Sequence, residues 1–344
     1  MTTVPNMFGN GFDLAELTTA INIIPNLYGR LNELDVFPTE GITQNTMVMD
    51  QVNGVLTILP ESNKTGQTPG SPATVGRDED RGALTFKLPH IPHEDSVMPA
   101  DVQGRRAPGS TGPDTMTMAY LRKIVAGRRK FSLTLEYLRM GALKGIIVGG
   151  SGRTLYNLYT QFGITPKEVD FTLGTAGTNV MDKCYEVAGH MEDNLKGEVM
   201  NGARVLVSTE FFSKLIGHSK VQDAYKYFAT TNQANPLRED TRRRFPFGPL
   251  VFEEYRASGQ LADGSTQRFI GAGEGHAWPT GTLDTFKTYL GPANHQDFVN
   301  TVGQEAYAWP MPTPDGRGIN LFMESNPLPL CRRPALLVKC YTSN

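Results

Sequence analysis

Long apolar runs are absent from this 344-residue sequence, and so is an export signal. No segment approaches about eighteen consecutive apolar residues, the minimum for a helix that spans a bilayer. The first residues, MTTVPNMFGNGFDL, lack the basic region followed by an apolar run that marks a signal peptide. We therefore expect a protein that neither crosses a membrane nor is secreted by a signal peptide.

Cysteine and net charge are also scarce. The three cysteines, Cys184, Cys331 and Cys340, are odd in number, widely spaced and outside any CxxC or Cys/His ligand pattern. This usage is typical of a reducing compartment, without disulfides. The 33 basic and 35 acidic residues give a net charge of −2, which provides no global attraction to nucleic acid or to an anionic membrane. Any such contact is expected to be local.

The longest uninterrupted helical pattern runs from Asp114 to about Gly145. Pro113 precedes it, no proline interrupts it, and apolar residues recur near the helical period. These residues are Leu121, Val125, Leu135, Leu138 and Ala142. A helix of roughly thirty residues is about 45 Å long, well above the usual globular helix. Such a rod is suited to a scaffold role.

A predicted β-hairpin precedes this helix. Residues 46–59 are β-prone, and Leu84, Phe86 and Leu88 alternate with polar residues. The intervening residues 60–80 are too polar to build a core, so we expect a long projecting loop that is either functional or disordered. The end of this loop carries a cluster of charges of both signs: Arg77, Asp78, Glu79, Asp80 and Arg81.

The segments on either side of the hairpin and the rod are rich in glycine and proline. Residues 1–44 predict an arm that lies on another part of the protein, with residues 13–21 as its best helix. Residues 89–113 contain prolines that exclude a continuous helix or a central strand, so we expect an irregular bridge. After the rod, residues 144–162 predict a second hairpin around the turn GGSG.

The C-terminal half predicts a mixed α/β unit over residues 179–300. It contains helical patterns at 180–195, 209–217 and 220–227, and a buried strand ARVLVS. The strands PLVFEEYRA and QRFIGAGEG are expected to be separated by the turn ASGQLADGS. Beyond residue 301 the chain is predicted to be extended and to end in the strand ALLVKCYT.

Candidate catalytic and ligand motifs are weak. GGSGRT at 149–154 has an arginine where a phosphate-binding loop needs lysine, and its glycine spacing is wrong, so a hairpin turn is favoured. GAGEG at 271–275 does not satisfy GxGxxG, which favours a turn or bulge. His90 and His93 lie on a proline-flanked extended segment, where HxxH does not align two metal ligands. An α/β enzyme with a glycine-rich phosphate-binding loop remains the alternative, and no cofactor or metal is predicted.

After its first residue, Asp114, the predicted rod is strongly basic, and Glu136 is the one acidic counterpart of its cations. Its cations, together with Arg238 and residues 242–244, could form a positive surface toward polyanions. A solvated face with salt bridges to neighbouring subunits is favoured, because no nucleic-acid motif accompanies the charges. A DNA-binding protein would show a steep salt dependence of affinity. The cations of the rod are Arg122, Lys123, Arg128, Arg129, Lys130, Arg139 and Lys144.

Several longer motifs occur in an order that matches a known family. They are LPHIPHEDSVMPADVQGRRA at 88–107, LRMGALKGIIVGGSGRTLYNLYTQFGI at 138–164, PKEVDFTLG at 166–174 and ESNPLPLCRRPALLVKC at 324–340. With them, the sequence resembles the major capsid protein E family of lambda-like tailed phages over nearly its whole length. The resemblance implies an α+β protein with the Hong Kong 97 phage-type fold, acting as a non-enzymatic shell subunit.

The resemblance also implies a division of the chain. Residues 1–45 would be the N-terminal arm, 46–88 the extended hairpin loop, 89–178 the peripheral domain with its spine helix at 114–144, and 179–300 the axial domain. Residues 301–344 would return to the peripheral domain.

The partners that the resemblance implies are those of a phage head. They are other copies of the chain as pentamers and hexamers, a separate scaffolding protein, a decoration protein, the portal at one vertex and packaged double-stranded DNA contacted non-specifically. No membrane partner is implied. The shell would be a virion component assembled in the host bacterial cytoplasm.

Eight charged residues are the candidate subunit interface. The cluster at the base of the loop, residues 77–81, is expected to form salt bridges across subunits because it carries charges of both signs. Exposed arginines of the rod would add contacts with neighbours, and Gly127 would let the rod bend between shell positions. The eight residues are Arg77, Asp78, Glu79, Asp80, Arg81, Arg122, Arg128 and Arg129.

Overall fold

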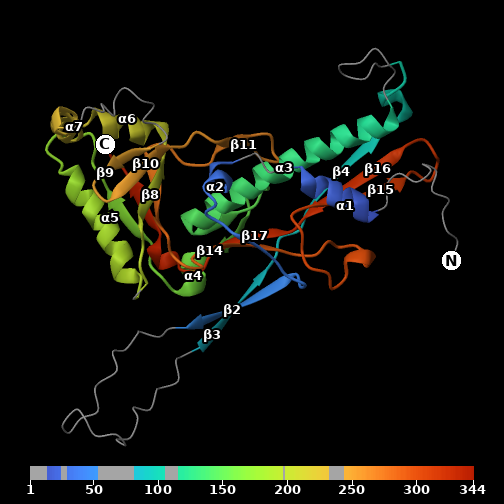
Figure 1. Ribbon diagram of the computed structural model, residues 1–344, viewed down its shortest axis with the longest axis horizontal. Coiled ribbons are helices and arrows are strands. Elements are labelled where there is room, and N and C mark those ends of the chain that lie inside the picture. The colour runs from blue at the N-terminus through green and yellow to red at the C-terminus, as the bar shows by residue number, and fades with distance from the viewer. Residues whose placement is uncertain (1–13, 25–28, 53–80, 105–114, 197, 232–243) are drawn as a thin grey trace, which may run out of the picture.

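A long helix crosses the protein and joins a sheet-and-helix unit at one end to a smaller sheet at the other (Figure 1). The computed structural model describes residues 14–24, 29–52, 81–104, 115–196, 198–231 and 244–344. The α-helices are α1 Leu14–Ile23, α2 Arg30–Glu33, α3 Met116–Lys144, α4 Leu158–Phe162, α5 Val180–Asn194, α6 Thr209–Gly217 and α7 Ser219–Thr231. Short 3-10 turns lie at Pro99–Asp101, Gln296–Phe298 and Pro334–Leu336.

The strands form several separate sheets. The strands of the first half are β1 Thr39–Gly41, β2 Thr46–Val52, β3 Arg81–Lys87, β4 Ile91–Val97, β5 Ile146–Val148, β6 Thr154–Asn157 and β7 Lys167–Asp170. Those of the second half are β8 Gly202–Val207, β9 Phe245–Phe247, β10 Leu250–Glu254, β11 Ser258–Gln260, β12 Thr266–Arg268, β13 Glu274–Thr280, β14 Phe286–Leu290, β15 Tyr307–Pro312, β16 Ile319–Ser325, β17 Pro327–Cys331 and β18 Val338–Tyr341.

Helix α3 is the predicted rod, and its pattern of apolar residues is confirmed. The side chain of Thr115 accepts a hydrogen bond from the Met118 N–H at 3.2 Å, which caps the first turn. Gly145 ends the helix in the left-handed region with φ of 78°. Ile124 packs in a core with α1 and β15, whereas Leu143 packs in the central core, so one helix serves two cores.

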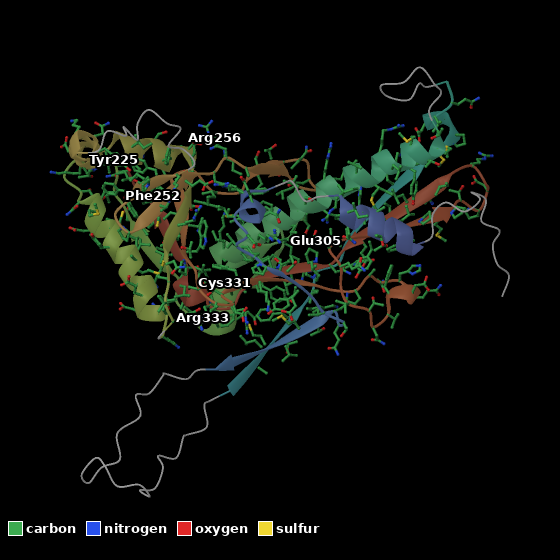
Figure 2. The ribbon with its side chains drawn as sticks, in the orientation of Figure 1. Tyr225, Phe252, Arg256, Glu305, Cys331 and Arg333 are labelled. Atoms are coloured by element: carbon green, nitrogen blue, oxygen red, sulfur yellow. The ribbon has the colours of Figure 1, made fainter. Side chains whose placement is uncertain are left out.

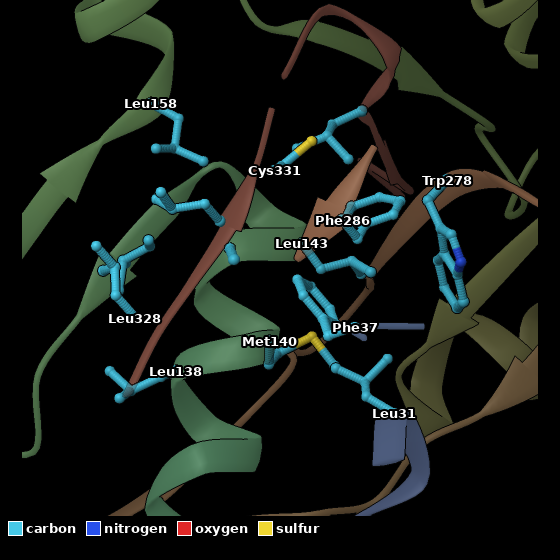
Figure 3. Close-up of a cluster of buried hydrophobic side chains, with 14 of the residues drawn as sticks. Leu31, Phe37, Leu138, Met140, Leu143, Leu158, Trp278, Phe286, Leu328 and Cys331 are labelled. Atoms are coloured by element: carbon cyan, nitrogen blue, oxygen red, sulfur yellow. The ribbon is translucent and has the colours of Figure 1, made fainter. Parts of the chain in front are cut away.

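The central core surrounds the second half of α3 (Figure 3). Side chains from α3 meet side chains from the α2 region, α4 and strands β13, β14 and β17, all buried. Those labelled in Figure 3 are Leu31, Phe37, Leu138, Met140, Leu143, Leu158, Trp278, Phe286, Leu328 and Cys331. Because these residues come from elements that are far apart in the sequence, this core holds the arm, the rod and the C-terminal strands together.

A six-stranded sheet with the order β7-β18-β13-β8-β10-β9 forms the unit at the left of Figure 1. Side chains alternate across its faces. Val205 and Cys340 face the core shared with α5 and α6, whereas Leu206 and Trp278 face the central core beside α3. The sheet therefore has a covered helical face and a face turned toward the end of the rod.

The six-stranded sheet also includes strands from outside residues 179–300. β7 comes from before residue 179, and β18 comes from after residue 300. β18 pairs with β13 and with β7, so the terminal strand joins the α/β sheet instead of returning to the rod with β16. The sheet that β18 joins is determined by pairing with segments that are distant in the sequence, so a local sequence pattern does not predict it.

Two smaller sheets extend along the rod. One has the order β1-β14-β17, and the other has the order β15-β16-β4. The irregular bridge expected at 89–113 is wrong for residues 91–97, because they form β4. Pro92 is tolerated there because β4 is an edge strand, where a missing N–H need not break a ladder. The arm helix α1 lies on β15 and α3, as an arm was expected to.

The other local predictions are mostly confirmed. β2 and β3 pair as an antiparallel hairpin that projects from the body (Figure 1). β5 and β6 pair around the GGSG turn, but residues 158–162 form α4 after the Asn157 cap instead of continuing the strand. The sequence ASGQLADGS is not only a turn, since it contributes β11, which pairs with β12. The strand expected over QRFIGAGEG is interrupted, and β13 begins at its end.

Candidate assembly surfaces

The root of the projecting hairpin is held by aromatic packing. Phe86 of β3 is fully buried, and its ring lies 5.3 Å from that of Tyr156 in an edge-to-face arrangement. The Tyr156 hydroxyl accepts a hydrogen bond from the Lys87 N–H at 2.7 Å and donates one to the Lys87 carbonyl at 2.8 Å. The opposite face of the hairpin is exposed, with Val48 at 62% exposure. The anchored root leaves one face of the hairpin for contact with another molecule.

The predicted charge cluster of the loop lies almost entirely outside the described residues. Arg77, Asp78, Glu79 and Asp80 lie outside the described residues, and Arg81 begins β3 without a described side chain. Their role in subunit contacts stays a prediction.

The basic residues of α3 divide into two groups. Arg122 and Arg129 are exposed, as a contact surface requires. Arg128 is only 4% exposed and forms an ion pair with Glu305, labelled in Figure 2, while its Nε donates to the Ile24 carbonyl at 3.5 Å. These intrachain contacts account for Arg128 without a neighbouring subunit.

Arg139 is also directed inward. It is 2% exposed, and its guanidinium donates to the Asn32 side chain at 2.8 Å and to the Thr288 hydroxyl at 3.3 Å. Burial lowers its pKa, and the negative charge of Glu136 opposes that shift. The positive face predicted from the sequence is therefore narrower than the count of arginines and lysines indicated.

A polar junction beside Arg139 was not predicted. The Glu136 carboxylate is 1% exposed and accepts a hydrogen bond from the Leu31 N–H and another from the Tyr255 hydroxyl, each at 2.9 Å. Arg30 binds the carboxylate of Glu253, with Nε and Oε1 2.5 Å apart. The one sequence signal for a buried role of Glu136 is that it is the single acidic residue of the basic helix α3. The junction fixes the arm against the rod and β10.

A pocket of about 660 Å³ lies where α3 ends against the six-stranded sheet. Its polar lining includes Lys144, Glu168, Glu274, His276 and Lys339. Lys339 contacts both carboxylates, at 3.1 Å from Glu274 and 3.7 Å from Glu168. Burial lowers the pKa of His276 well below its ordinary value, and the nearby charges of Lys144 and Lys339 add to the shift. These residues share no motif in the sequence, so they were not predicted to lie together.

The candidate phosphate motifs are turns. In GGSGRT the Gly149 N–H donates to the Arg153 carbonyl at 2.9 Å, which closes the turn between β5 and β6. In GAGEG the Glu274 N–H donates to the Gly271 carbonyl at 3.2 Å, just before β13. Both predicted turns are confirmed.

The histidine pair has structural contacts. His90 Nδ1 lies 3.0 Å from Glu324 Oε1, and His93 Nε2 lies 3.1 Å from Lys130 Nζ. Within the described ranges, no group of three or more His, Cys, Asp or Glu side chains is arranged to hold a metal ion. The three cysteines are buried free thiols. Among the described helices, none has the length and apolarity to cross a membrane.

Comparisons with known proteins converge on one family. Residues 13–341 match the family model described as phage major capsid protein E. The chain is 34% identical to the major capsid protein of Pseudomonas phage KPP10, over 98% of this chain and 99% of the relative. It is 30% identical to the major capsid protein of Salmonella phage Felix O1, over 95% of each chain.

Solved structures agree at the level of the fold. A prophage capsid protein structure from E. coli CFT073 has a TM-score of 0.58 at 14% identity and matches over 96% of this chain and 99% of that chain. The capsid of Ralstonia phage GP4 has a TM-score of 0.50 at 10% identity, over 90% of this chain and 88% of that chain.

Proposed function

Because this chain belongs to the phage major capsid protein E family, we propose that its copies assemble as pentamers and hexamers into the icosahedral head of a tailed phage. The major capsid role and the α+β fold of the Hong Kong 97 phage type, both expected from the sequence, are confirmed. The observation that carries the assembly proposal is the anchored hairpin, whose outer face is exposed while its root is fixed by Phe86 and Tyr156.

The elements have proposed roles within such a shell. Helix α3 is the spine of the peripheral part, together with β4, β15 and β16, and the six-stranded sheet with α5, α6 and α7 is the axial part. The β2–β3 hairpin is the extended loop that lies on a neighbouring copy. This division is supported by the two buried cores that α3 joins and by the separate core of the six-stranded sheet.

The subunit interface includes the charged residues at the base of the hairpin and the exposed arginines of α3. Arg122 and Arg129 are supported by their exposure. Residues 77–81 are supported only by their charges of both signs, three acids between two arginines, which favour a fixed register between neighbours. Arg128 is left out of the proposed interface because its contacts lie within the chain.

The other proposed partners are those of a head that is assembled and then filled. We include a separate scaffolding protein, a decoration protein, the portal at one vertex and packaged double-stranded DNA contacted non-specifically, with assembly in the host bacterial cytoplasm. The protein acts without enzymatic activity. In support, the GGSGRT segment that carried the enzyme alternative closes a β-turn and lacks the lysine of a phosphate-binding loop.

Electron microscopy of the expressed full-length chain, with and without the neighbouring phage genes, tests the assembly proposal. Uniform closed shells with capsomers of five and six copies are expected. A small monomer that persists under all assembly conditions would contradict it. For the loop, simultaneous charge reversal of Asp78, Glu79 and Asp80 is expected to lower shell yield, and an unchanged yield and shell stability would remove these residues from the interface.

A further inference from the structure

The pocket at the end of α3 is lined by a row of side chains on three adjacent strands of the six-stranded sheet, β7, β18 and β13. Glu168 of β7 is in register with Lys339 of β18, and Lys339 is in register with His276 of β13. Aligned residues on neighbouring strands point to the same face of a sheet. Lys144, in the last turn of α3, also lines the pocket and completes its set of charged side chains.

Two nitrogen atoms in this lining have no partner among the described residues. His276 is 6% exposed, and its Nε2 atom has no hydrogen-bond partner in the described part of the chain. The half-buried Lys144 side chain forms no ion pair or hydrogen bond within the same residues, although the negative charge of Glu274 is near enough to oppose the lowering of the Lys144 pKa by burial. A buried donor without an acceptor is costly, so this pair is suited to an oxygen ligand that enters the pocket.

The remaining walls restrict the chemistry of that ligand. They are largely apolar, with Ile146, Val148, Tyr159, Ile164 and Pro166, and also include Asn157, Thr160, Gly163 and Thr165. Ile146 keeps 40% of its surface exposed. Apolar walls with a few convergent polar groups are typical of small-ligand sites, and the volume of about 660 Å³ is in their usual range. One unpaired ammonium matches a single negative charge better than it matches a doubly charged, strongly hydrated phosphate.

We propose that this pocket binds a carboxylate that carries a small apolar body. The carboxylate accepts hydrogen bonds from Lys144 Nζ and, in the tautomer with its proton on Nε2, from His276, while the apolar body contacts the walls. This site goes beyond the shell-forming role. A free small carboxylic acid and an aspartate or glutamate of a neighbouring copy share this chemistry, and the experiment distinguishes them.

Saturation-transfer NMR with butyrate tests the proposal on the full-length chain, both as unassembled subunits and as assembled shells. Butylamine has the same apolar body with the opposite charge, and inorganic phosphate has the anionic charge without the body. Butyrate is expected to bind the subunit, whereas butylamine is not. Equal binding of both probes, binding of phosphate but not butyrate, or a pocket that takes only water would each overturn the proposal. This comparison requires no variant.

A matched pair of variants locates the binding. Lys144→Met keeps the apolar stem and removes the ammonium, so butyrate affinity should fall about tenfold or more. Lys220→Met removes an exposed ammonium of α7 and should leave the affinity unchanged. Unchanged affinity in Lys144→Met would overturn the assignment.

Comparison of subunits with shells identifies the source. Butyrate binding to both supports a small-molecule ligand, whereas binding to subunits but not to shells supports a carboxylate supplied by a neighbouring copy. Shell formation is scored separately by electron microscopy, so failure of the pocket proposal and failure of the assembly proposal are distinguishable.

Discussion

The carboxylate of Glu136, buried on α3, accepts a 2.9 Å hydrogen bond from the hydroxyl of Tyr255, which directly follows β10. The same oxygen accepts a bond from the Leu31 N–H, so the arm, the rod and the α/β sheet meet at one atom. The junction of Glu136 is the polar connection among them.

Tyr255→Phe should lower the free energy of unfolding of the unassembled subunit by about 1 kcal/mol, the usual contribution of one hydrogen bond. The aromatic ring stays in place, so the change isolates the hydroxyl. Urea titration followed by circular dichroism measures the effect. Tyr185→Phe is the matched control because Tyr185 is 60% exposed on α5, and equal losses in the two variants would argue against the junction.

Glu136 should make stability depend on pH in the sense opposite to a salt-bridged carboxylate. Burial raises its pKa, against the opposing effects of the Leu31 N–H, the Tyr255 hydroxyl and Arg139. Between the ordinary and the raised pKa the folded state binds more protons than the unfolded state, so stability falls as pH rises through that window. Above the raised pKa the loss is complete.

Glu136→Gln removes this titration and should make the subunit gain stability relative to the unmodified protein as pH rises through the same window. Denaturant titrations at a series of pH values measure the difference in free energy of unfolding between the two proteins. A difference that does not vary with pH would show that Glu136 is equally protonated in the folded and unfolded states, and one that varies with the opposite sign would show that folding lowers its pKa.

Gly127→Ala should destabilise the subunit, although alanine favours a helix. An added Cβ would lie 2.3 Å from Sδ of Met323, which is 1% exposed, so the sulfur must move. Overpacking costs about 1–3 kcal/mol, against a propensity gain of up to about 1 kcal/mol. In Gly189→Ala on α5 the added Cβ meets no atom within 4 Å, so that variant should be slightly stabilised.

Thermal unfolding of the two glycine variants reports the contrast, and a stabilised Gly127→Ala protein would contradict the packing role. The structure thus adds a close approach between α3 and β16 to the bending role predicted from the sequence. Bending near Gly127 stays a prediction, and identical curvature of α3 in every copy of a shell would refute it.

Arg128 and Arg129 are adjacent in sequence and should behave differently. Arg128→Met should destabilise the isolated subunit by about 1–3 kcal/mol, because it removes buried charge-assisted hydrogen bonds. Arg129→Met should change subunit stability by no more than about 0.5 kcal/mol, as is usual for an exposed site, and should slow shell assembly.

Chemical denaturation of subunits and light scattering during assembly separate the two effects. Assembly of Arg129→Met at the unmodified rate would exclude that arginine from the interface. Unchanged stability of Arg128→Met would show that its ion pair with Glu305 contributes nothing to the fold.

The features predicted correctly from the sequence depend on neighbours in the chain. The spacing of Leu135 and Leu138 predicts α3, alternation around Phe86 predicts β3, and GGSG predicts the turn between β5 and β6. Each signal reflects local backbone geometry and needs no distant partner. The longer motifs were sufficient to identify the family because they are specific and occur in the same order between residues 88 and 340.

Only the tertiary structure decided which charged groups are buried and which strands are neighbours. Arg128 and Arg129 look equivalent in sequence, but burying the first requires acceptors from Glu305 and Ile24, which are brought to it by folding. Likewise, β18 enters the six-stranded sheet and places Lys339 beside His276 through pairing with β13. The burial of a charge and the pairing of strands depend on residues that are far away in the chain, so the local sequence pattern does not predict either of them.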